Sequence, residues 1–102
     1  MTGEMLKSLI EEIRTVSLDT LVNKNERYAT VDRLHNFRAG AELTNQTMAQ
    51  TAWGYMTKHL VALRDKIEAD DFTDREDFKE KVQDCINYLC LIWAIGNEVR
   101  RE

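Results

Sequence analysis

The sequence predicts an all-α protein, and three observations lead to this prediction. The chain of 102 residues contains no proline and only four glycines, whereas β-sandwiches and β-barrels depend on frequent glycine and proline turns. Apolar residues recur at three- and four-residue spacing, the period of an amphipathic helix. Two segments have the sequence of a helix capping box. We therefore expect a four-helix bundle with two long and two shorter helices, formed by residues 1–102 as a single domain.

The first two helices are predicted from the spacing of their apolar residues. Between residues 3 and 22, methionine, leucine, isoleucine and valine recur every three or four positions, with charged residues between them. The polar run 23–25 is expected to end this helix. A shorter helix is expected over residues 30–42, with Leu34 and Phe37 on its buried side.

Capping sequences mark the start of the third and fourth helices. Thr-Met-Ala-Gln at 47–50 and Thr-Asp-Arg-Glu at 73–76 both have the form of a capping box, in which two side chains satisfy backbone N–H groups at the helix start. The apolar spacing that follows predicts helices over residues 47–68 and 73–99, joined by a turn at 70–72.

The last predicted helix changes character along its length. Up to residue 83 it is amphipathic, but residues 85–95 are apolar nearly all the way round. Such a helix needs cover on most sides, so we expect a homodimer or a higher homo-oligomer. Cys85 and Cys90 lie in this segment at a spacing that suits neither a disulfide nor a zinc site. Both are expected to be small core residues.

Charge and hydropathy exclude several classes of protein. The formal net charge of −4 argues against general binding to the nucleic-acid backbone. The first residues lack the basic and apolar regions of a secretory signal. The longest apolar run, 88–95, is far shorter than the roughly 20 residues of a membrane-spanning helix. We expect no membrane partner, and the predicted location is the cytoplasm.

Acidic residues on the last predicted helix form a candidate metal site. Asp84 and Asn87 lie on a helical stripe, shared with Glu80, that continues into apolar residues, so both should face other helices. A carboxylate directed into a bundle must be paired, hydrogen-bonded or bound to a cation, and Mg²⁺ prefers such oxygen ligands. The alternative is a structural Asp84 that pairs with Lys58 or Arg64 while Glu80 is solvated.

The third predicted helix supplies further polar candidates. Lys58 and Asp65 are seven residues apart and therefore aligned two turns from each other. His59 lies at the edge of the apolar stripe, where a histidine is either a satisfied boundary residue or a ligand-binding one. These residues could hold phosphate or a metal ion opposite the acids of the last helix.

The segment before the second helix is rich in groups that recognise ligands. Residues 28–37 combine aromatic, cationic, imidazole and amide side chains near a helix start, where anions such as phosphate are favoured. The alternative is a connector in which Leu34 and Phe37 pack while the polar residues face water.

The chain resembles the MazG-like all-α nucleotide pyrophosphohydrolases in three stretches, residues 26–37, 52–60 and 80–89. The first stretch contains Glu-Arg-Tyr and, after three further residues, Asp-Arg-Leu-His-Asn-Phe. The second stretch is Ala-Trp-Gly-Tyr-Met-Thr-Lys-His-Leu, and the third is Glu-Lys-Val-Gln-Asp-Cys-Ile-Asn-Tyr-Leu. The chain more closely resembles the short nucleotide-modification-associated helical domains of phages and prophages. The resemblance implies an oligomeric four-helix fold that binds Mg²⁺ and a nucleoside triphosphate in a bacterial host cytoplasm, and hydrolysis between the α- and β-phosphates.

The resemblance also implies roles for individual residues. Metal ligands in the family come from an ExxE motif and an ExxD motif on facing helices. In this chain, Lys81 occupies the position of the glutamate in the ExxD motif. The third helix has Lys58-His59 where the ExxE motif is expected. The implied metal ligands are Glu80, Asp84 and Asp65, and the implied catalytic residues are Asp84, Glu80 and Lys58. The implied substrate-binding residues are Tyr28, Arg33, His35, Asn36, Phe37, Trp53, His59 and Asn87.

The departures from the family motifs leave more than one function open. The chain is compatible with a nucleotide pyrophosphohydrolase in which Mg²⁺ activates water. The alternative is a non-catalytic nucleotide-binding protein, or a small phage protein that blocks a host defence. A structural protein whose apolar segment 85–95 meets a partner is a third alternative.

Overall fold

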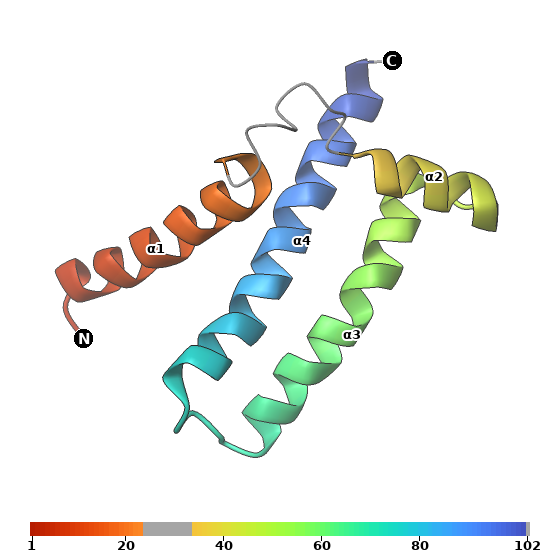
Figure 1. Ribbon diagram of the computed structural model, residues 1–102. Helices are drawn as coiled ribbons and strands as arrows, with labels where there is room; N and C mark the ends of the chain where they lie inside the picture. Colours follow the sequence, from red (N-terminus) through yellow and green to blue (C-terminus); the bar gives the residue numbers. More distant parts are fainter. Residues whose placement is uncertain (24–33, 102) are drawn as a thin grey trace. The chain divides into compact units, whose positions relative to one another are not determined.

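The computed structural model describes residues 1–23 and 34–101 of the chain, and the regular structure within these ranges is entirely helical. The elements are α1 (Gly3–Leu18), a π-helical turn η1 (Asp19–Asn23), α2 (His35–Thr44), α3 (Met48–Glu68) and α4 (Arg75–Arg101). The predicted all-α fold, with two long and two shorter helices, is confirmed (Figure 1). The chain divides into two units, Met1–Val31 and Asp32–Glu102, which are described in turn. The prediction of a single domain over residues 1–102 stays a prediction.

The first unit contains α1 and η1. Thr2 caps α1 because its hydroxyl accepts a hydrogen bond from the backbone N–H of Met5 at 3.2 Å. The predicted helix over residues 3–22 was too long as an α-helix, since the α-helical backbone ends at Leu18 and widens into the π-helical turn. Asp19 and Thr20 are weak helix formers whose side chains compete for backbone groups.

The second unit is built on α3 and α4, which lie side by side and run in opposite directions (Figure 1, green and cyan to blue). Ala52 and Met56 of α3 and Ile95 of α4 are almost completely buried. The hydrophobic core continues into α2 through Phe37 and, just before α2, through Leu34. The predicted burial of Leu34 and Phe37 is therefore confirmed.

The boundaries of α2 differ from the prediction of residues 30–42. The structure shows α2 from His35 to Thr44, while residues 30–33 lie outside the described part of the chain. Asn45 ends the helix in the left-handed conformation, with a φ of 55°, which asparagine tolerates better than most residues. An ion pair between Arg38 and Glu98 links α2 to α4.

The capping box predicted at the start of α3 is confirmed, and that of α4 is corrected. Thr47 accepts from the N–H of Gln50 at 3.0 Å, and the Gln50 side chain accepts from the N–H of Thr47 at 2.9 Å. At α4 the capping side chain belongs to Asp74, which accepts from the N–H of Asp77 at 3.1 Å. The hydroxyl of Thr73 instead donates to Asp71 in the turn at 3.1 Å.

The two cysteines of α4 differ in exposure. Both are free thiols; Cys85 is buried as predicted, but Cys90 is exposed. The prediction that both are core residues is therefore wrong for Cys90, because five residues on a helix turn two side chains to different sides. Burial, and then the charge of Asp84, raise the pKa of the Cys85 thiol.

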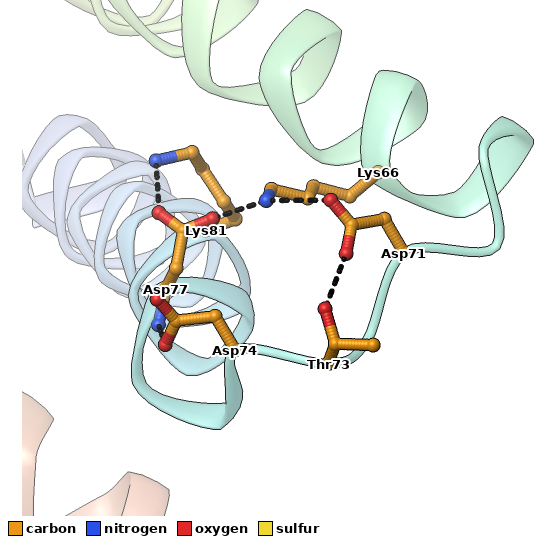
Figure 2. Close-up of polar contacts among 6 residues, drawn as sticks. All are labelled: Lys66, Asp71, Thr73, Asp74, Asp77 and Lys81. Atoms are coloured by element: carbon orange, nitrogen blue, oxygen red, sulfur yellow. Dashed lines mark hydrogen bonds and ion pairs between the residues drawn. The ribbon is translucent and has the colours of Figure 1, made fainter.

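An ion-pair cluster closes the end of the α3–α4 hairpin (Figure 2). The ammonium group of Lys66 pairs with Asp71 in the turn at 3.2 Å and with Asp77 in the first helical turn of α4. Lys81 pairs with the other oxygen of Asp77 at 3.2 Å. One lysine thus joins the end of α3, the connecting turn and the start of α4.

The same contacts shift the pKa values of the three central groups. Hydrogen bonds to Asp77 and then Asp71 raise the pKa of Lys66. The hydrogen bond from Lys66 is the largest cause of the lowered pKa of Asp71 and of Asp77. The folded protein therefore favours the charged form of all three side chains.

Gly40 lets α2 approach α3 closely. A methyl group at Gly40 would lie 2.8 Å from the hydroxyl of Tyr55 and 2.9 Å from the Cγ2 of Thr51, whereas a methyl group at Gly54 would meet nothing within 4 Å. Tyr55 is exposed and could move aside, but Thr51 is buried. The two glycines therefore have different structural requirements.

We expect Gly40→Ala to lower the free energy of unfolding by about 1–2 kcal/mol, because the buried Thr51 must shift. Gly54→Ala should raise it by about 0.5–1 kcal/mol, because alanine restricts the unfolded chain and favours the helix. Urea denaturation of both variants at the same pH measures the difference. Equal effects of the two substitutions would contradict the close approach.

The ion-pair cluster predicts a pH dependence of stability. Because the pKa values of Asp71 and Asp77 are lowered from 3.8, their stabilising contribution is present above that pH and is lost as the pH falls through the folded-state values. The contribution of Lys66, whose pKa is raised from 10.5, is lost as the pH rises beyond that value. Lys66→Met should therefore destabilise the protein at neutral pH, and the deficit should disappear in acid.

Denaturation of the wild type and of Lys66→Met across a pH series provides the measurement. Lys58→Met is the matched control, since Lys58 is an exposed lysine of the same helix outside the cluster. A deficit of Lys66→Met that persists at a pH below the lowered pKa values of Asp71 and Asp77 would show that the lysine acts through packing and not through its charge.

Candidate functional site

Two of the predicted site residues meet across the α3–α4 interface. Nδ1 of His59 lies 3.4 Å from Oδ2 of Asp84, and both side chains are partly exposed. The prediction that Asp84 faces α3 is confirmed. The predicted partners Lys58 and Arg64 are wrong, because Lys58 is exposed and Arg64 pairs with Asp65 at 3.3 Å on its own helix.

Aromatic contacts hold His59 in place. Its ring lies 5.2 Å from that of Tyr88, at 30° to it, and Tyr88 contacts the ring of Phe37 edge-on at 6.4 Å. Burial, then the charge of Asp84, and then Tyr55 raise the pKa of the Tyr88 phenol. Tyr88 is therefore a neutral group beside the His59–Asp84 pair at physiological pH.

The three carboxylates predicted as metal ligands do not form one group in the described part of the chain. Glu80 and Asp65 are both exposed. Within residues 1–22 and 34–98, whose side chains the structure describes, no three His, Cys, Asp or Glu side chains are grouped so that they could hold a metal ion. Asp84 has His59 beside it in place of a second acid. The Mg²⁺ site stays a prediction.

The predicted substrate-binding residues fall into several environments. His35 and Asn36 are exposed in the first turn of α2. Phe37 is only 6% exposed and belongs to the core, as the alternative interpretation of residues 28–37 expects, and its implied role in substrate binding stays a prediction. Asn87 is also buried, and its Oδ1 accepts from Nε2 of Gln83 at 3.0 Å. Tyr28 and Arg33 lie outside the described residues.

Trp53 stands in a groove at the start of α3. The indole is 58% exposed, and the groove has a volume of about 500 Å³. Its walls come from the connection between α2 and α3, the first turns of α3 and one side chain of α4. The lining residues are Gln46, Ala49, Gln50, Trp53, Gly54 and Ile92.

The groove combines an aromatic face with two oriented amides. The side-chain oxygen of Gln46 accepts from the hydroxyl of Thr44 at 3.2 Å, and that of Gln50 accepts from the N–H of Thr47 at 2.9 Å. In the part of the chain that the structure describes, the NH₂ groups of these two glutamines donate no hydrogen bond. They are therefore donors for the acceptor atoms of a ligand.

Sequence reasoning identified Trp53 but missed the rest of this groove. Gly54 directly after Trp53 was a usable signal, because a residue without a side chain leaves space beside the indole. Gln46 and Ile92 gave no such signal, since they are 46 residues apart and only the α3–α4 contact brings them to one groove.

No protein-family model, curated protein or solved structure matches the chain. None of the helices in the described residues has the length and apolar character needed to cross a membrane. A proposal of function therefore depends on the groove, the His59–Asp84 pair and the exposed surfaces.

We expect Asp84→Asn to change the free energy of unfolding by less than about 1 kcal/mol, because the His59–Asp84 pair is partly exposed to water. Urea denaturation at neutral pH measures the change, with Asp65→Asn as the control for an exposed carboxylate of α3. A loss of several kcal/mol would mean that the fold requires Asp84 for its stability. An effect of its substitution on ligand binding would then follow from unfolding and would not identify a binding residue.

Proposed function

We propose that the protein binds a nucleotide, with the base lying against Trp53 in the groove at the start of α3. The observation that supports this proposal is the combination of one exposed indole and two amide donors around a space of about 500 Å³. Ligand sites for small molecules have volumes of roughly 300–1,000 Å³ and combine apolar walls with a few polar groups. The groove falls within this range of volume and has mainly apolar walls, and it is wide open to solvent.

The chemistry of the groove suits a base better than a saturated ligand. Stacking of a base on an aromatic side chain contributes about 1–3 kcal/mol and tolerates any base. The NH₂ groups of Gln46 and Gln50 suit the ring nitrogens and carbonyl oxygens at the edge of a base. Ile92 adds an apolar contact from α4.

The start of α3 also suits the phosphate groups of a nucleotide. Ala49 lies in the first turn of this 21-residue helix and lines the groove, whereas the N–H of Gln50 is bonded to the hydroxyl of Thr47. The N–H groups at the start of a helix, together with its dipole, favour negative charge. A base on Trp53 would thus have a favourable site for its phosphates nearby. Nucleotides are also the ligand class that the sequence resemblance implies.

Our proposal is for binding, and it assigns no hydrolytic reaction. Hydrolysis of a phosphoanhydride with Mg²⁺ needs several carboxylates to hold the metal. Asp84 is paired with His59, and Asp65 with Arg64. Release of pyrophosphate in the presence of Mg²⁺ is therefore tested separately from binding.

Single-tryptophan variants test the binding site directly. Trp93→Phe leaves Trp53 as the only tryptophan, so titration with a panel of nucleoside mono-, di- and triphosphates should quench its fluorescence. Trp53→Phe leaves Trp93, whose fluorescence should not respond. Trp53→Ala should weaken the affinity measured by calorimetry about tenfold or more, because the stacking energy is lost. Nucleotide binding that Trp53→Ala leaves unchanged would refute the site.

Filling the groove tests the same site without removing an aromatic ring. Gly54→Leu introduces a side chain where an added Cβ has open space, so the helix should remain stable while the groove is blocked. Gly96→Leu is the matched control, since an added Cβ there also meets nothing within 4 Å. We expect loss of nucleotide binding in Gly54→Leu alone. Equal binding by both variants, with and without chelator, would contradict the proposal.

A further inference from the structure

The outer face of α4 carries a row of apolar side chains that is independent of the groove. Val82, Ile86, Leu89 and Trp93 follow one another at spacings of four, three and four residues, the repeat with which one helix packs along another. Leu89 is 54% exposed and Trp93 is 71% exposed. Val82 and Ile86 are half-buried. The row thus has the pattern of a helix contact, and its half towards the C-terminus is open to solvent.

The row points away from the core of the second unit. Tyr88 and Ile95, which pack towards α2 and α3, lie roughly on the opposite side of α4 from Trp93 at 100° per residue. The α3–α4 contact therefore leaves this side of α4 uncovered.

The charge distribution restricts what can cover the row. Residues 85–97 contain no charged side chain, which corresponds to about 20 Å of helix. The centres of protein interfaces are depleted of charge in the same way. A partner that presented charge here would have to desolvate it without compensation. An equally uncharged helix face is the complementary surface.

A second copy of the chain offers such a face in matching order. In an antiparallel pair with a two-fold axis between Ile86 and Leu89, each Ile86 lies opposite the Leu89 of the other copy, since both are equally far from the axis. Each Trp93 likewise lies opposite a Val82, so the largest side chain of the row meets the smallest. Such self-complementarity is what a two-fold contact requires, and antiparallel helices also oppose their dipoles favourably.

The area of the row indicates the strength of this contact. An aromatic side chain has about 150–250 Å² of surface, so the exposed Trp93 and Leu89, with the half-buried Val82 and Ile86, expose on the order of 300–400 Å² per copy. Two copies would bury on the order of 700 Å² together, which is the size of a weak, transient contact. The contact should therefore be reversible and depend on protein concentration.

We infer that the row Val82, Ile86, Leu89 and Trp93 is a homodimer interface in which α4 packs antiparallel on α4 of a second copy. The side chains of this interface lie outside the Trp53 groove, so the test of the interface is independent of the test of nucleotide binding.

Analytical ultracentrifugation over a wide range of concentrations tests the interface. The wild type should convert from monomer to dimer as concentration rises, and Leu89→Glu should remain monomeric at concentrations where the wild type is mostly dimeric. Val61→Glu is the matched control, since Val61 is an exposed apolar residue of α3, and it should dimerise as the wild type does. Circular dichroism confirms that each variant is helical.

A second measurement does not depend on a disruptive substitution. In Trp53→Phe, the emission of the remaining Trp93 should be that of an exposed indole in dilute solution and should shift to shorter wavelength as the dimer forms. A wild type that is monomeric at all concentrations would overturn the inference. Dimerisation that survives Leu89→Glu, or a Trp93 already shielded in the monomer, would do the same.

Discussion

The contact between α3 and α4 is the constraint on which the candidate sites of the second unit depend. Ala52, Met56 and Ile95 are almost completely excluded from water along this contact, so the register of the two helices is fixed by close packing. Substituting a polar residue at any of these positions would remove the main apolar burial of the unit. The Lys66 cluster fixes the same register from the other end, where the connecting turn is short (Figure 2).

Two different polar environments arise on the two edges of that contact. On one edge, His59 meets Asp84 and stacks on Tyr88. On the other, Trp53 and Ile92 form walls of the groove. Trp53 and His59 are six residues apart on α3, so their side chains project about 120° apart. The ion pair and the groove are therefore separate features, and an effect on one need not be an effect on the other.

Much of the fold could be predicted because its signals are local. Helix spacing and the Thr47 capping box depend on residues within a few positions of each other. The errors arose where two local structures of similar energy compete. After Leu18 a π-helical turn forms in place of the predicted α-helix, and Asp74 caps α4 in place of the predicted Thr73. The prediction that Asp84 faces another helix succeeded because helical periodicity reports direction. The predicted partners of Asp84 were wrong because the periodicity of one helix contains no information on its register with the next helix.

The sequence by itself determined that the chain is helical, where α3 begins, which face of each helix is apolar, and that residues 85–97 of α4 are uncharged. Only the tertiary structure decided that Phe37 is a core residue, that His59 is the partner of Asp84, and that Gln46 and Ile92 share a groove with Trp53. The physical reason is that periodicity and capping are set by neighbours along the chain, whereas a groove or an ion pair between helices is set by their packing. That packing depends on the volumes of all the buried side chains together.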